Sequence, residues 1–194
     1  NTGGTGTGNF AVGVYVNSFD TVTLRQVTID VEPAAGGAPS PRAIAAGQAI
    51  VIVENSHITA TSTTGAEAIS FGTQNATVSD LTVRDSVVAA NGTTTHGVEM
   101  VQGTATIDGT TITASKPIRL WALQDDLNMT VSHSMLNGVS EFDASAGQTI
   151  DVFVTHTFIK IEFGFILILF GEFLRKGCNF FGAAIKVVVS LDQL

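Results

Sequence analysis

Short runs of alternating apolar and polar residues recur along the first 160 residues of the chain. Six eight-residue segments have apolar first, third and eighth positions: residues 22–29, 51–58, 81–88, 105–112, 129–136 and 152–159. The third position falls on Leu24, Val53, Val83, Ile107, Val131 and Val154, which sets a repeat of 23 to 30 residues. Self-similarity at this length is typical of solenoids, in which each repeat forms one coil.

A bend is predicted at the fifth position of every segment. That position holds a polar residue or glycine: Gln26, Asn55, Asp85, Gly109, His133 and His156. The sixth position carries a small hydroxyl side chain in every segment after the first: Ser56, Ser86, Thr110, Ser134 and Thr157. Because strand side chains alternate between two faces, the first and third positions point inward before the bend, and the sixth and eighth after it. The tenth position continues inward with Val31, Ala60, Ala90, Ala114 and Gly138, which predicts a narrow interior.

A third strand precedes most segments, and loops of variable length connect it to its neighbours. We place this strand at residues 12–16, 68–71, 97–100 and 117–121, and the clearest loops at residues 32–42 and 90–96. Strands of constant length with insertions between them indicate a solenoid. We therefore predict an all-β, right-handed, single-stranded parallel β-helix of about six coils. An antiparallel sandwich also alternates every second residue, but it does not require the same bend residue in consecutive units.

The repeat pattern stops after Lys160. Seven of the twelve phenylalanines lie from Phe158 onward, and residues 163–171 are continuously apolar. That run is shorter than the roughly 20 residues that a membrane-spanning helix needs. We predict a parallel β-helix repeat domain over residues 1–160 and an apolar C-terminal cap or last coil over residues 161–194. Two alternatives for this tail are non-native sequence and, less favoured, membrane contact through residues 161–175.

Composition and charge narrow the class of protein. Hydrophobic residues make up 44% of the 194 residues and charged residues 13%, which disfavours both a disordered chain and a charge-rich helical bundle. Residues 1–157 hold 5 Lys or Arg against 14 Asp or Glu, a net charge of −9. A nucleic-acid partner is therefore not expected, because it requires a basic track. The single cysteine, Cys178, excludes an intrachain disulfide framework.

The repeats resemble the pectin-lyase-like superfamily of right-handed β-helices, over about residues 10–160. Within it they are most similar in style to the passenger regions of bacterial autotransporters and related surface adhesins, as in residues 96–115 (HGVEMVQGTATIDGTTITAS). The resemblance implies a fold; it is weakly specific for function, because such folds carry many activities.

An enzyme of this superfamily would need clustered carboxylates as acid and base, or to hold calcium beside a basic residue. Asp125 and Asp126 form an adjacent pair that resembles the paired aspartates of polygalacturonases, and Arg119 is a nearby candidate base. The accompanying Asn-Thr-Asp, Gly-His-Gly and Arg-Ile-Lys elements are absent, and Thr95-His96-Gly97 matches only in part. We therefore expect Asp125 and Asp126 to be loop residues, and predict no catalytic set and no cofactor.

Three further columns of stacked side chains are candidates for functional sites. His133 and His156 share the bend column, and a metal ion could bridge them, but without an evident third ligand we expect a solvated turn pair. A column of alternating charge is predicted to form weak surface ion pairs: Arg25, Glu54, Arg84 and Asp108. A threonine column of the kind that orders water in ice-binding solenoids is interrupted by Ile52 and Phe153, so strand preference explains it more simply.

These observations lead to a functional expectation. We expect an extracellular or cell-surface scaffold, adhesin-like or autotransporter-passenger-like, that presents loops to a glycan or to a host or cell-surface protein. The signal peptide that such an exported chain needs is not in this sequence. The alternative is a polysaccharide lyase or glycoside hydrolase, and calcium is the candidate cofactor if the chain is a lyase.

Overall fold

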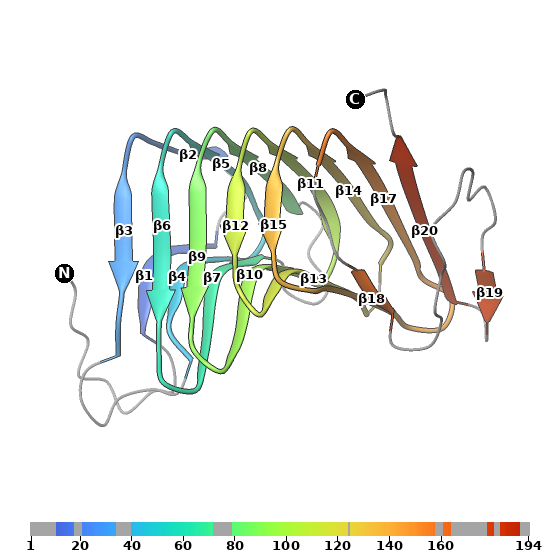
Figure 1. Ribbon diagram of the computed structural model, residues 1–194, viewed down its shortest axis with the longest axis horizontal. Helices are drawn as coiled ribbons and strands as arrows, with labels where there is room; N and C mark the ends of the chain where they lie inside the picture. Colours follow the sequence, from blue (N-terminus) through green and yellow to red (C-terminus); the bar gives the residue numbers. More distant parts are fainter. Residues whose placement is uncertain are drawn as a thin grey trace.

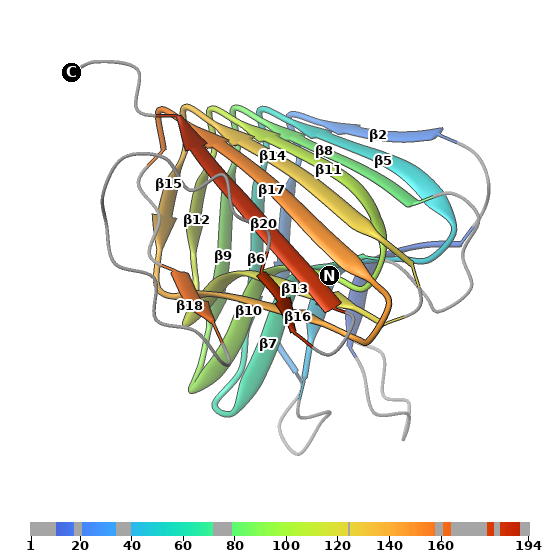
Figure 2. The ribbon, with the colours of Figure 1, turned by 90° about the vertical axis from the view of Figure 1, so that its right-hand side faces the viewer.

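The computed structural model describes residues 11–17, 21–33, 40–71, 79–123 and 125–157, and the backbone of 161–163, 178–180 and 183–190. Every regular element in these residues is a β-strand (Figures 1 and 2). The described residues contain no helix with the length and apolar character required to cross a membrane.

Three parallel sheets wrap around one interior, and each coil contributes one strand to each sheet. The seven-stranded sheet contains β1 (Val12–Val16), β4 (Arg42–Ala46), β7 (Gly65–Phe71), β10 (Thr94–Met100), β13 (Lys116–Ala122), β16 (Ser140–Ala144) and β18 (Ile161–Phe163). The eight-stranded sheet contains β2 (Thr21–Arg25), β5 (Ala49–Glu54), β8 (Ser79–Arg84), β11 (Gly103–Asp108), β14 (Leu127–Ser132), β17 (Thr149–Thr155), β20 (Ala183–Ser190) and β19 (Cys178–Phe180). The five-stranded sheet contains β3 (Thr28–Val31), β6 (His57–Thr61), β9 (Val87–Asn91), β12 (Thr111–Thr113) and β15 (Met135–Asn137).

The predicted solenoid and its register are confirmed. Each apolar third position pairs with the third position of the next coil, from Leu24 opposite Val53 to Val131 opposite Val154. The described chain forms about five complete coils rather than six. The sixth repeat forms β17 and its bend, but its second strand would begin at residues 158–160, which lie outside the described residues.

The structure describes only part of the predicted C-terminal tail. β20 pairs in parallel with β17, and β19 pairs antiparallel with β20. Residues 164–177, which carry most of the apolar run, lie outside the described residues. The proposal of a cap or last coil over residues 161–194 therefore stays a prediction.

Every bend residue adopts the left-handed conformation that the sequence pattern requires. The φ angles lie between 46° and 58° at Gln26, Asn55, Asp85, Gly109, His133 and His156. Asparagine, aspartate and glycine tolerate this conformation best, and β-branched residues tolerate it worst. This explains why the fifth position never carries the valine or isoleucine that is common elsewhere in the strands.

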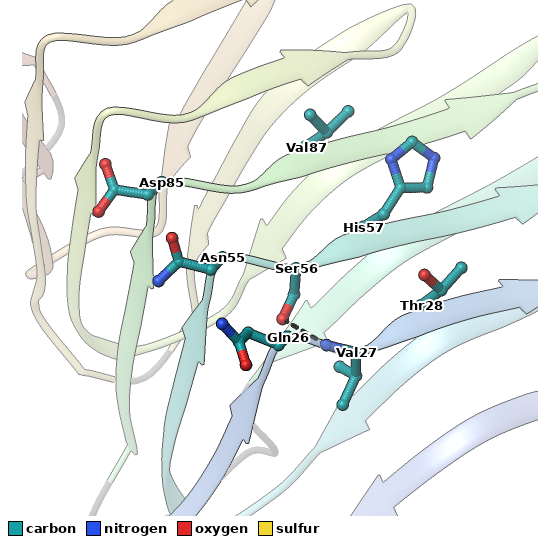
Figure 3. A pocket seen from close by; sticks show the side chains of 8 residues that line it. All are labelled: Gln26, Val27, Thr28, Asn55, Ser56, His57, Asp85 and Val87. Carbon is teal, nitrogen blue, oxygen red and sulfur yellow. Dashed lines mark hydrogen bonds between the residues drawn. The ribbon is translucent and has the colours of Figure 1, made fainter.

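The hydroxyl side chains after the bend form an internal ladder. Each oxygen accepts a hydrogen bond from the backbone N–H of the equivalent residue one coil earlier, as from Ser86 N to Thr110 Oγ1. Each hydroxyl also donates to the carbonyl two residues before it, as from Thr110 to Asp108 O at 2.9 Å. Figure 3 shows the first rung, from Val27 N to Ser56 Oγ. Val27 lies in the first described coil, where no described N–H from an earlier coil requires an acceptor.

We predict that Thr110→Val lowers the free energy of unfolding by about 2 kcal/mol, because it leaves the Ser86 N–H and one carbonyl lone pair without partners in a buried site. Valine conserves the shape of threonine, so the loss reports the hydroxyl alone. The matched control is Thr106→Val, the same change at a partly exposed position of β11, which is expected to cost less than about 0.5 kcal/mol. Urea unfolding of both variants measures the difference, and equal costs would contradict the ladder's role.

The interior is narrow, as predicted from the small tenth positions. Ala60, Ala90 and Ala114 are buried. The prediction for Gly138 was wrong, because this residue is exposed. Gly138 has a φ of 130°, and a Cβ there would lie 2.0 Å from the Ala114 carbonyl oxygen. A close approach between backbones, rather than the width of the interior, therefore explains the glycine.

Candidate functional site

A shift in the alternation of buried and outward residues within the seven-stranded sheet determines which side chains face outward. Two consecutive residues are buried at the same place on each of four strands: Ala43 with Ile44, Ala68 with Ile69, Gly97 with Val98, and Pro117 with Ile118. The usual alternation therefore shifts by one residue. As a result, residues three apart, such as His96 and Glu99, lie on the same outer face.

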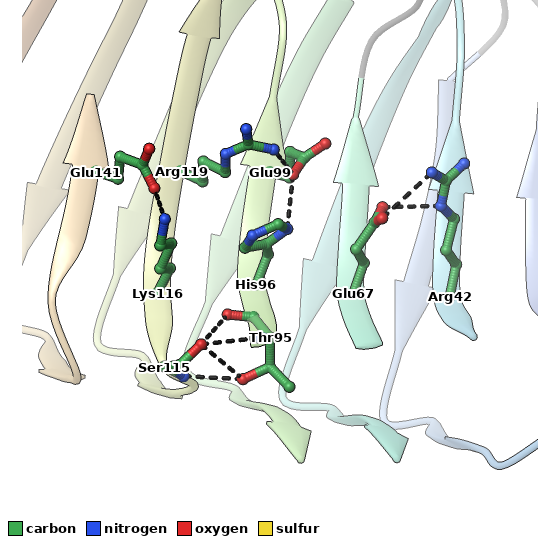
Figure 4. Close-up of polar contacts among 9 residues, drawn as sticks. All are labelled: Arg42, Glu67, Thr95, His96, Glu99, Ser115, Lys116, Arg119 and Glu141. Carbon is green, nitrogen blue, oxygen red and sulfur yellow. Dashed lines mark hydrogen bonds and ion pairs between the residues drawn. The ribbon is translucent and has the colours of Figure 1, made fainter. Parts of the chain in front are cut away.

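Charged side chains from five strands meet on this outer face, which we call the charged face. It comprises Arg42, Glu67, His96, Glu99, Lys116, Arg119 and Glu141. Figure 4 shows these side chains in sequence across neighbouring strands. The distance from Arg42 Nε to Glu67 Oε2 is 2.8 Å, and Lys116 contacts Glu141. Side chains of opposite charge on this face therefore form ion pairs between adjacent coils.

Glu99 is the centre of the charged face. Its Oε2 lies 2.7 Å from His96 Nδ1 and 2.8 Å from Arg119 Nη1. Burial is the largest single influence and raises the pKa of Glu99, but the contacts with His96 and Arg119 together outweigh it and lower the pKa to about 2. Glu99 is therefore a fixed negative charge at neutral pH.

Glu67 Oε2 and His96 Nδ1 are among the atoms of the charged face that are buried without a well-aligned hydrogen bond. Both atoms make close charge contacts, to Arg42 and Glu99 respectively, at angles that are poor for hydrogen bonding. Such atoms have remaining capacity to bind a ligand.

A surface pocket of about 490 Å³ opens beside Glu67 and His96. Its wall is rich in hydroxyl groups and consists of Ser40, Thr64, Gly65, Ala66, Glu67, Thr93, Thr94 and His96. Next to the pocket residues Thr94 and His96, Thr95 binds Ser115 and holds β10 against β13, because each backbone N–H donates to the other side chain's oxygen at 2.8 Å. The two strands that carry His96, Glu99 and Arg119 are thus fixed in register.

An aromatic side chain borders the charged face. The guanidinium of Arg119 lies over the ring of Trp121, 5.0 Å from its centroid. Trp121 is partly exposed. This arrangement combines a flat apolar surface with a row of hydrogen-bonding groups.

A second pocket, of about 510 Å³, lies at the corner between the eight-stranded and five-stranded sheets (Figure 3). Bend residues and the first residues of the following strands line it: Gln26, Val27, Thr28, Asn55, Ser56, His57, Asp85 and Val87. The hydroxyl of Ser56 already serves the internal ladder. The arrangement offers fewer converging charged groups than the charged face does.

The structure separates the residues that the sequence suggested as catalytic. Asp125 and Asp126 are exposed in the connection between β13 and β14. Asp126 Oδ1 accepts a hydrogen bond from Thr149 N at 2.8 Å, a contact that stabilises the loop. Arg119 lies on the charged face, paired with Glu99 rather than with either aspartate.

The two histidines suggested as metal ligands lie on adjacent coils, as expected. Their rings stack at 5.1 Å with an interplanar angle of 7°. His133 Nδ1 also lies 2.9 Å from Asp108 Oδ1, and hydrogen bonds from Ser132 and His133 lower the pKa of Asp108. Within the described chain, the one group of three potential ligands gathers elsewhere, at Glu67, His96 and Glu99.

Three members of the predicted column of surface charges form ion pairs on the eight-stranded sheet, whereas the fourth, Asp108, contacts Ser132 and His133. Arg25 pairs with Glu54 at 2.6 Å, and Arg84 lies 3.7 Å from the same carboxylate. Both arginine side chains are at least half exposed. These pairs therefore contribute little stability, at most about 1 kcal/mol each.

The sequence interpretation missed the charged face because it was anchored on the segments around the bend. A second alignment, anchored on the upstream strands, reveals it. Four of these strands contain a charged or titratable residue, then a small residue or proline, then isoleucine or valine: Arg42-Ala-Ile, Glu67-Ala-Ile, His96-Gly-Val and Lys116-Pro-Ile. That recurrence places the four leading side chains in one column, as the register confirms.

Comparisons with known proteins give no family for this chain. No family model, no curated protein and no solved structure matches it.

Proposed function

We propose that this chain is an extracellular or cell-surface β-solenoid scaffold that binds a neutral glycan on its charged face. The observation that carries the proposal is the hydroxyl-lined pocket beside Glu67 and His96, on a face that also bears Trp121. The solenoid supplies a rigid support, since each coil is hydrogen-bonded to the next.

The chemistry of the pocket suits a sugar. Its volume lies in the range of small-molecule sites, about 300–1,000 Å³. Serine and threonine hydroxyls both donate and accept hydrogen bonds, as sugar hydroxyls do, and a carboxylate adds a strong acceptor. Outside the pocket lining, on the outer face of the same sheet, the partly exposed Trp121 provides a flat surface for the apolar face of a sugar ring.

The charge of the protein favours a neutral glycan over an acidic one. The whole chain carries a formal charge of −8. The cations of the charged face are already paired with carboxylates: Arg42 with Glu67, Arg119 with Glu99, and Lys116 with Glu141. A polyuronate would meet a repulsive overall field and few uncompensated cations.

The proposal is tested by screening the purified chain against immobilised neutral and acidic oligosaccharides, followed by calorimetry on the best ligand. Thr94→Arg fills the pocket from an exposed position and is expected to weaken binding at least tenfold. The matched control, Thr130→Arg, makes the same change on the exposed face of β14 and should bind as the wild type does. Absence of binding to every neutral glycan, or equal binding by the two variants, contradicts the proposal.

A second candidate function is hydrolysis or lysis of a polysaccharide. The observation that favours it is the proximity of two carboxylates and an imidazole, Glu67, Glu99 and His96, beside the same pocket. The same oligosaccharides, assayed for new reducing or unsaturated ends, distinguish the two functions. Turnover that Glu99→Gln removes would assign the enzyme, and retention without turnover would assign the scaffold.

A further inference from the structure

We propose that Glu67, His96 and Glu99 form a binding site for a divalent transition-metal ion of the Zn²⁺ type. One ligand atom from each residue lies within 4.8 Å of the other two. The three residues come from two adjacent strands, β7 and β10, whose register is fixed by a continuous ladder of pairs. The site is therefore built on rigid elements rather than on loops.

The geometry requires only small movements to bind an ion. Tetrahedral zinc, with ligand distances of about 2.0–2.2 Å, places its donor atoms about 3.3 Å apart. Starting from spacings of up to 4.8 Å, each donor moves inward by about 1 Å or less. Rotation of the two glutamate side chains supplies such a movement without a change in the strands.

The kinds of donor point to a transition metal rather than to calcium or magnesium. An imidazole nitrogen with two carboxylate oxygens suits zinc and its first-row neighbours, whereas calcium and magnesium select oxygen ligands alone. Three protein donors leave a coordination position for water or a ligand, and the pocket beside Glu67 and His96 provides the space for it.

The surrounding residues support the donors in the way that outer-shell residues do at metal sites. Arg42 holds the carboxylate of Glu67, and Arg119 holds that of Glu99. The buried atoms Glu67 Oε2 and His96 Nδ1, which lack a well-aligned hydrogen bond, would gain a strong partner. An ordinary ladder of surface ion pairs, such as Arg25 with Glu54, leaves its atoms well bonded.

The inference is independent of the proposed glycan function, because the metal alone serves as the probe. The chain is treated with a chelator, dialysed and titrated with Zn²⁺ by calorimetry, and Co²⁺ absorption reports the coordination of a bound ion. We expect one ion per chain, with a micromolar or lower dissociation constant and visible Co²⁺ bands of low coordination number. His96→Gln is expected to weaken binding at least 30-fold. Glu67→Gln should also weaken it.

The control variant is His133→Gln, which removes an exposed histidine from the stacked pair with His156 and should leave the affinity for Zn²⁺ unchanged. Circular dichroism of every variant confirms that the solenoid is intact. The proposal is overturned if the wild-type chain binds no stoichiometric ion, if His96→Gln binds as tightly as the wild type, or if His133→Gln abolishes binding.

Discussion

Replacement of Gly97 by alanine is expected to lower the free energy of unfolding by about 3 kcal/mol, the upper part of the usual range for overpacking. A Cβ at this position would lie 2.3 Å from Ile112 Cγ2 and 2.6 Å from the Pro117 carbonyl oxygen. The first contact is with a fully buried side chain and the second with the backbone of the next strand. Urea unfolding of wild type and variant measures the loss.

Two further variants show whether crowding is the cause. Ala68 occupies the same column one coil earlier and is itself buried, so Ala68→Gly should cost only about 1 kcal/mol or less. Ile112→Ala removes the methyl group that Gly97→Ala would meet. The cost of Gly97→Ala should therefore be at least 1 kcal/mol smaller in the Ile112→Ala background than in the wild type. Additive costs would show that the methyl group is not the obstacle.

The position of Gly97 also connects the core to the charged face. It lies between His96 and Glu99, at the shift in alternation that leaves both side chains on the outer face. A backbone displaced by a new Cβ would change the spacing of these two side chains. Gly97→Ala is therefore expected to weaken Zn²⁺ binding as well as stability, whereas Thr110→Val should affect stability alone.

The fold was predictable because three independent signals in the sequence agree. The apolar third positions, from Leu24 to Val154, defined the register that the strands adopt. The bend column coincides with left-handed φ angles, which only some residue types tolerate. The small tenth positions anticipated the narrow interior, except at Gly138. Local conformational preference and hydrophobic pattern thus specify the same coil.

The hydroxyl ladder was visible in the sequence as a pattern but not as an interaction. The alternation placed Ser56, Ser86 and Thr110 inside, which is an unusual location for polar side chains. Their role depends on backbone N–H groups that the bend leaves without a strand partner. That these N–H groups require a side-chain acceptor follows from the three-dimensional path of the bend, so the composition of the segment alone does not reveal the interaction.

The candidate site was less predictable than the fold, for a physical reason. Glu67 lies on β7, and His96 and Glu99 lie on β10. Because the loops between successive strands differ in length, the spacing between Glu67 and the other two residues in the sequence carries little information. The shift in alternation at Gly97 then places His96 and Glu99 on one face, although strict alternation would separate them. Asp125 and Asp126, by contrast, are adjacent in the sequence, and the structure places both in an exposed loop.

The ionisation of Glu99 predicts a specific loss of stability in acid. Its pKa is about 2 in the folded protein, against an ordinary value of 4.5. A carboxyl group whose pKa is lowered by folding stabilises the protein above its unfolded pKa, and this contribution is lost as the pH falls through the folded value. This lowering of the pKa corresponds to about 3 kcal/mol of stability, present above about pH 4.5 and lost towards pH 2.

The comparison of wild type with Glu99→Gln isolates this contribution from that of the other carboxyl groups. In urea unfolding with a chelator present, the wild type should exceed the variant in stability at pH 6, and the difference should shrink by about 3 kcal/mol as the pH approaches 2. The control is Glu54→Gln, which removes a carboxylate from the ion pairs with Arg25 and Arg84 and should cost at most about 1 kcal/mol at any pH. A difference for Glu99→Gln that does not change with pH would mean that His96 and Arg119 do not hold this carboxylate ionised, and that the charged face is organised by packing instead.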